Sequence, residues 1–153
     1  MYRPAPNLRF LSVAVLALLP GIVAADYRSD IGHTRLQQEL GITTPDGTGI
    51  RVTQVEGSEK VNGQDAWFPD PANAEFVGKT ISNASGAPAG LYSSHATSVG
   101  GSFYGDLRSI APGVTNIAAF SANDWMGAGA LLTVVGSGGS RPLSSTSRVA
   151  NHS

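Results

Sequence analysis

The stretch Ile50–Val55, which reads IRVTQV, is followed directly by Glu56 and Gly57. Its length and its β-branched residues predict a short strand. Because apolar and polar residues alternate at its start, we expect this strand to be half buried. A carboxylate therefore stands where the predicted strand ends.

A second stretch, Ser93–Gly101, reads SSHATSVGG and places His95 just after two hydroxyl residues. Its small residues and the capping serines predict the start of a helix. One stripe of that helix would hold Ala96, Val99, Gly100 and Phe103, and their small size would let the helix pack closely on a sheet. We expect the helix to end at Gly105.

The other elements are expected on either side of these two stretches. Residues 30–40 predict a helix capped by Thr34 and ended by Gly41. Strands are expected at 76–81, 115–120 and 148–151, a further helix at 125–135, and loops at 57–75, with Trp67 and Phe68 packed inward, and at 137–147. The alternation of strands and helices predicts an α/β fold with a parallel sheet and flanking helices.

Composition limits the class of protein. The 153 residues suffice for one ordinary domain, and only 14% of them are charged, with a net charge of -1. Neither sign of charge clusters, so a nucleic-acid groove is not expected. The chain has no cysteine and therefore no disulfide. Three histidines, His33, His95 and His152, lack metal-ligand spacing, so neither a metal nor a cofactor is expected.

The N-terminus has the pattern of a secretory signal peptide over residues 1–25. Arg3 and Arg9 precede an apolar run, Phe10–Leu19, and small residues before Asp26 offer a cleavage site. The run is shorter than the roughly 20 residues that cross a membrane. We therefore expect a secreted, periplasmic or cell-envelope protein without stable membrane insertion after cleavage. An uncleaved anchor is the alternative.

Glu56 and His95 are the candidate catalytic residues. In open parallel sheets, ligands bind beyond the carboxyl ends of the strands, where Glu56 would lie. His95 would lie at a helix N-terminus, where the helix dipole helps to keep the imidazole neutral. A carboxylate that is hydrogen-bonded to one ring nitrogen of a histidine leaves the other nitrogen free to accept the proton of a nucleophile. Spacing alone equally permits a solvated glutamate and a histidine near a helix cap.

The histidine stretch resembles a known motif. Residues 94–101 are similar to the HGTHVAG motif of subtilisin-like serine proteases (subtilases), and His95 falls on its catalytic histidine. Ser109–Val114 (SIAPGV) looks like the family's GVAPGA segment. Gly47–Glu56 (GTGIRVTQVE) resembles the family's GxGVxVAVID segment, with Glu56 in place of the aspartate.

The resemblance covers about residues 47–120 and extends to residues 149–153, which are similar to the strand that lines the family's substrate cleft. It implies an incomplete subtilisin-like parallel sheet, with residues 26–153 as the N-terminal portion of the catalytic domain. The implied activity is that of an exported serine endopeptidase acting on a protein or peptide substrate. Glu56 would orient His95, which would act as general base and then general acid.

The family's nucleophile segment, GTSMA, and the asparagine of its oxyanion hole do not appear. Four serines lack the required neighbours, and most of them are ordinary loop serines; these are Ser98, Ser137, Ser140 and Ser144. Asn151 belongs by its neighbours to an earlier strand. We therefore expect the chain to be inactive alone. The alternative is a secreted, non-catalytic binding or structural module that retains part of the protease fold.

Overall fold

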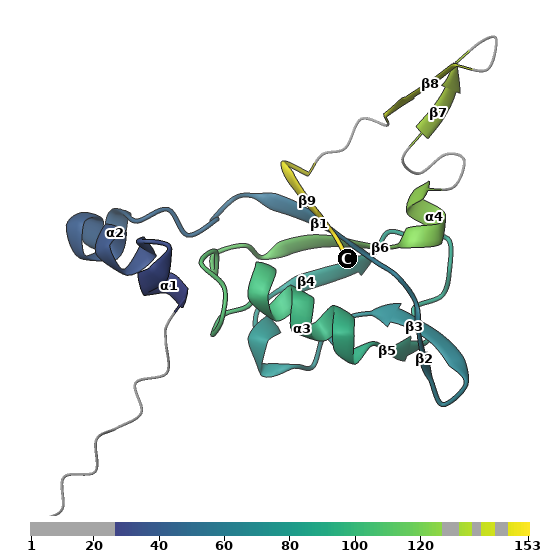
Figure 1. Cartoon of the computed structure of the whole chain (residues 1–153), viewed down its shortest axis with the longest axis horizontal. Coiled ribbons are helices and arrows are strands. Elements are labelled where there is room, and N and C mark those ends of the chain that lie inside the picture. The colour runs from purple at the N-terminus through teal and green to yellow at the C-terminus, as the bar shows by residue number, and fades with distance from the viewer. Residues whose placement is uncertain (1–26, 127–131, 136–138, 143–146) are drawn as a thin grey trace, which may run out of the picture.

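A four-stranded parallel sheet lies at the centre of the computed structural model, which describes residues 27–126, 132–135, 139–142 and 147–153 (Figure 1). The strand order is β4 (Thr80–Asn83), β6 (Asn116–Ser121), β1 (Arg51–Glu56) and β9 (Val149–His152). Each neighbouring pair is parallel. Helices flank this sheet, so the expected α/β fold is confirmed. The predicted signal peptide, residues 1–25, lies outside the described residues.

Strand β1 is more deeply buried than its sequence predicts. Only Arg51 is exposed, and every residue from Val52 to Glu56 is buried, including Thr53 and Gln54. The expectation of a half-buried strand was wrong because β1 lies inside the sheet, between β6 and β9, and its side chains pack against residues of other elements. On one face Val52 joins an apolar cluster formed by residues from several elements: Phe76, Tyr104, Val114 and Ile117.

The expected loop at 57–75 contains an antiparallel hairpin. Strands β2 (Glu59–Val61) and β3 (Gln64–Phe68) are joined at Asn62 and Gly63, whose φ angles are 51° and 79°. Two positive φ angles in a two-residue turn are typical of a type I′ hairpin, and Asn-Gly is its preferred sequence. Strand β5 (Leu91–Tyr92) pairs with β3 in parallel. Trp67 and Phe68 are buried as expected, but on a strand.

Helix α3 (Ser94–Phe103) confirms the predicted helix and covers part of one face of the central sheet (Figure 1). It ends at Phe103, two residues before the expected Gly105. Of the predicted stripe, Ala96 and Gly100 are buried. A Cβ at Gly100 would lie 2.7 Å from Tyr104 Oη, so only glycine permits this close packing.

The predicted helix at 30–40 is interrupted. Two helices occur, α1 (Tyr27–Asp30) and α2 (His33–Leu40), with Gly32 at φ 78° between them. Gly32 occupies the N-cap position of α2, so Thr34 does not cap it. Gly41 follows α2 as expected, with φ 55°, and opens a short 3-10 helix, η1 (Gly41–Thr43).

Two further expectations are corrected. The segment expected as a strand at 76–81 starts on the last residue of a 3-10 helix, η2 (Ala74–Phe76). Asn73 caps this helix by accepting from the Glu75 N–H at 3.0 Å. Strand β4 follows only at Thr80. The helix expected at 125–135 is shorter and earlier, α4 (Ala122–Met126).

Beyond α4 the chain forms a hairpin. Strand β7 (Leu132–Val135) pairs antiparallel with β8 (Gly139–Pro142), which falls inside the expected loop at 137–147. The run Leu-Thr-Val-Val of β7 is rich in β-branched residues, which favour strands over helices. The strands expected at 115–120 and 148–151 are confirmed as β6 and β9.

Candidate functional site

Glu56 is the last residue of β1, at the carboxyl edge of the parallel sheet. Residues of one strand alternate between faces, so Val52, Gln54 and Glu56 share a face. That face carries α3, because Gln54 Nε2 donates a hydrogen bond of 2.8 Å to the Ala96 carbonyl in the first turn of the helix. The strand therefore delivers a carboxylate to the N-terminal end of α3.

The start of α3 is fixed by side-chain hydrogen bonds. Ser93 is the N-cap, and its Oγ accepts from the Ala96 N–H at 2.9 Å. Such capping satisfies a backbone donor that the helix itself leaves unpaired. Glu59 of β2 accepts from Ser93 Oγ at 2.6 Å and from the His95 backbone N–H at 3.2 Å. A carboxylate at a helix N-terminus is further stabilised by the helix dipole.

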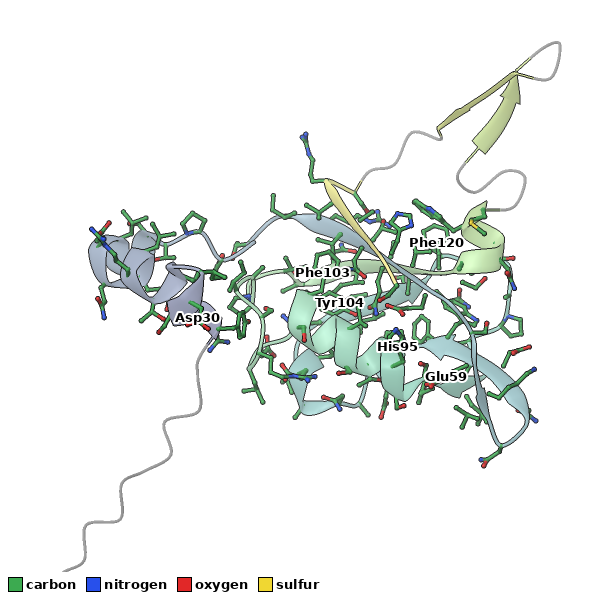
Figure 2. The ribbon with its side chains drawn as sticks, in the orientation of Figure 1. Asp30, Glu59, His95, Phe103, Tyr104 and Phe120 are labelled. Carbon is green, nitrogen blue, oxygen red and sulfur yellow. The ribbon has the colours of Figure 1, made fainter. Side chains whose placement is uncertain are left out.

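The structure brings the two predicted site residues together. Glu56 Oε2 lies 3.6 Å from His95 Nε2, and the Glu56 side chain is 1% exposed whereas that of His95 is 55% exposed. This distance exceeds that of a hydrogen bond but allows a charge contact. Among the described residues, Glu56 Oε2 has no hydrogen-bond partner. His95 thus lies between a buried acid and solvent. Figure 2 shows His95 on α3, close to Glu59.

The electrostatics of the pair follow from burial. Desolvation raises the pKa of Glu56, and the Gln54 amide and the His95 charge only partly offset it. The pKa of Glu59 is lowered, first by the Ser93 hydroxyl and then by backbone N–H groups. Burial and the Glu56 charge raise the pKa of Tyr104 far above its usual range, so Tyr104 remains a proton donor in hydrogen bonds.

An open groove of about 480 Å³ lies beside His95, between α3 and β9. His95, Ser98 and Ser102 line it from the helix, and Asn151 and Ser153 line it from the end of β9. Asn151 is the register partner of Gln54, so its side chain points to the face of the sheet that carries α3. Val99 and Phe103 also line the groove, so both polar and apolar side chains lie beside His95.

The described residues place no serine in the position expected for a nucleophile. Within them, no serine hydroxyl is hydrogen-bonded to the His95 ring. Ser98 lines the groove one turn along the same helix. The side chains of Ser137, Ser140 and Ser144 lie outside the described part of the structure. Asn151 lies in β9, as predicted, and its Oδ1 is buried without a partner in the described part of the chain.

Other kinds of site were searched for in the same part of the molecule. No group of three or more His, Asp or Glu side chains that could hold a metal ion occurs among the described residues. None of the described helices is long and apolar enough to cross a membrane. In comparisons with protein-family models, curated proteins and solved structures, nothing matched this chain.

Three residues at the site escaped the sequence prediction: Gln54, Glu59 and Tyr104. The signal for Glu59 was present, since the Asn62-Gly63 pair predicts a hairpin that returns Glu59 toward its partner strand. Gln54 gave a weaker signal, a polar residue at a position where the alternation from Ile50 and Val52 predicts an apolar one. Tyr104 lies 50 residues from the Gln54 that it contacts, and no local pattern reports such a pairing.

Proposed function

We propose that Glu56 and His95 are the acid and the base of a subtilisin-like serine endopeptidase site in an exported protein. The observation that supports this most directly is the 3.6 Å separation of Glu56 Oε2 and His95 Nε2. A buried acid at the end of a central parallel strand faces an exposed histidine at the start of the next large helix. This arrangement suits an acid that orients a general base.

The proposed chemistry is acyl transfer to water. His95 Nε2 faces Glu56, which leaves Nδ1 to take the proton of a serine hydroxyl. The serine oxygen attacks the peptide carbonyl, and His95 then gives the proton to the leaving amine. Water, deprotonated in turn by His95, releases the acid product and restores the serine. The groove between α3 and β9 would hold the extended peptide next to this histidine.

The serine is proposed to come from a part of the protein outside the described residues. A subtilase needs this serine and an oxyanion hole, because neither the acid nor the base attacks the peptide carbonyl. The proposed export rests on the signal pattern of residues 1–25.

The test begins with the in-frame coding sequence after residue 153. A GTSMA-like segment supports the enzyme, and a stop codon without such a segment contradicts it. The protein containing that segment is then exposed to a fluorophosphonate that labels activated serines. We expect labelling of the wild type, loss of labelling in His95→Ala, and unchanged labelling in the control Ser29→Ala, because Ser29 is exposed on α1 and does not line the groove. Undiminished labelling of His95→Ala would rule out His95 as the base.

The second candidate is a non-catalytic module that retains the fold. One observation favours it: no described serine hydroxyl is paired with His95. This candidate predicts that the protein binds peptides in the groove without cleaving them. Peptide binding that His95→Ala weakens, together with a complete lack of hydrolysis, would support the module over the enzyme.

A further inference from the structure

We propose that Gln54 is a positioning residue that aims Glu56 at His95, and that Tyr104 holds the Gln54 amide in the required orientation. This inference rests on the proposed function, since it assigns Gln54 and Tyr104 a role in the same site. Both residues are buried, and neither was predicted from the sequence.

Both polar atoms of the Gln54 side-chain amide are hydrogen-bonded. Gln54 Nε2 donates to Glu56 Oε1 at 2.7 Å and to the Ala96 carbonyl at 2.8 Å. Gln54 Oε1 accepts from Tyr104 Oη at 2.5 Å. A backbone carbonyl and an ionised carboxylate only accept hydrogen bonds, so the NH₂ group must face them. The amide oxygen must then face Tyr104, whose hydroxyl supplies the matching donor.

The two carboxylate oxygens of Glu56 therefore have different neighbours. Gln54 holds Glu56 Oε1, and Glu56 Oε2 is left 3.6 Å from His95 Nε2. The same amide ties β1 to the carbonyl of Ala96, the residue next to His95. The Gln54 side chain therefore positions both the Glu56 carboxylate and the first turn of α3, which carries His95.

If Gln54 only filled space in the core, an apolar side chain would be sufficient. Val52, two residues earlier on the same face, fills its place in the core with an apolar side chain. At position 54 an amide is buried instead, and burial of a polar group is favourable only when each of its polar atoms is paired. The pairing stabilises the ionised form of Glu56 without placing a second cation beside His95.

The test follows the Glu56 carboxyl carbon and the His95 ring nitrogens by NMR during a pH titration of the full chain. Loss of the Gln54 donor should raise the titration midpoint of Glu56 by about one pH unit, because a hydrogen bond to a charged group is lost. We expect this in Gln54→Leu, with the His95 nitrogen signals moving toward those of a free imidazole. Tyr104→Phe should raise the midpoint less, since the amide remains but can rotate.

Gln64→Leu is the matched control, because Gln64 is exposed on β3 and should leave both signals unchanged. If Gln54→Leu does not fold, Tyr104→Phe still tests the proposal, because it removes one oxygen and keeps the ring. A folded Gln54→Leu or Tyr104→Phe with wild-type Glu56 and His95 signals would overturn the proposal, even with lowered stability.

The titration needs neither a serine nor a substrate, so it separates the two proposals. A moved Glu56 midpoint without fluorophosphonate labelling would overturn the protease and leave the positioning role intact. Labelling that depends on His95, with an unmoved midpoint, would overturn the positioning role alone.

Discussion

Ser93 Oγ lies 2.6 Å from Glu59 Oε1, so the N-cap of α3 is tied to the hairpin that precedes it in the chain. The same hydroxyl accepts from the Ala96 N–H at 2.9 Å. One buried oxygen thus caps the start of α3 and links the helix to the β2–β3 hairpin next to His95.

Ser93→Ala should lower the free energy of unfolding by about 1 to 2 kcal/mol, because it removes the helix cap. Chemical denaturation measures this directly. Ser94→Ala is the control, since Ser94 is exposed and its Oγ lies 3.4 Å from the same carboxylate oxygen. Equal losses in the two variants would contradict the capping role.

Gly100→Ala should destabilise the packing of α3 against Tyr104. The new Cβ would lie 2.7 Å from Tyr104 Oη and 3.0 Å from Phe76 Cζ, and both rings are buried. Overpacking of this kind lowers the free energy of unfolding by about 1 to 3 kcal/mol. The higher helix propensity of alanine than of glycine offsets about 1 kcal/mol of that loss. We expect a lower melting temperature; a raised one would show that the rings can move aside.

Lys79 should contribute far more to stability than an exposed lysine. Its side chain is 1% exposed, and Nζ lies 2.8 Å from Asp106 Oδ1, 2.7 Å from the Pro112 carbonyl and 2.9 Å from the Val114 carbonyl. Lys79→Met leaves these acceptors without their donor, so we expect a loss of about 2 to 3 kcal/mol in denaturation.

Lys60→Met is the matched control for Lys79. The pair of Lys60 with Asp65 is short, 2.9 Å, but both side chains are more than half exposed. Solvent screens such a pair, so the change should stay within about 0.5 kcal/mol. Similar losses in the two variants would contradict the proposed difference.

Glu56→Gln should alter how stability depends on pH. Burial raises the pKa of Glu56 above its value in the unfolded chain, about 4.3. Between those two values the folded chain holds more protons than the unfolded chain, so the contribution of Glu56 to the free energy of unfolding falls as pH rises. The variant lacks this contribution.

Urea denaturation of both chains across this pH range isolates the effect. Carboxylates with lowered pKa values, such as Glu59 and Asp124, act in the opposite direction but are common to both chains. The difference, wild type minus variant, should therefore decrease with rising pH. A difference in unfolding free energy that stays constant or increases with pH would contradict a raised pKa for Glu56.

Local patterns sufficed for most central elements. The β-branched run predicted β1, the apolar stretch after the Pro112-Gly113 turn predicted β6, and the capping serines with small residues predicted α3. Errors occurred where a turn or a long-range partner decides the structure. The Asn62-Gly63 turn makes a hairpin of an expected loop, and Gly32 interrupts an expected helix.

By itself, the sequence determined the α/β class, and it predicted Glu56 and His95 as candidate site residues and the approximate positions of β1 and α3. Propensity, capping and alternation act between near neighbours, and they are visible in one dimension. Tertiary structure alone decided that Glu56 lies 3.6 Å from His95, 39 positions away, and that Gln54 lies between Glu56 and Tyr104. Such contacts follow from strand order and burial, which are set when apolar residues from distant parts of the chain pack into two core clusters and exclude water.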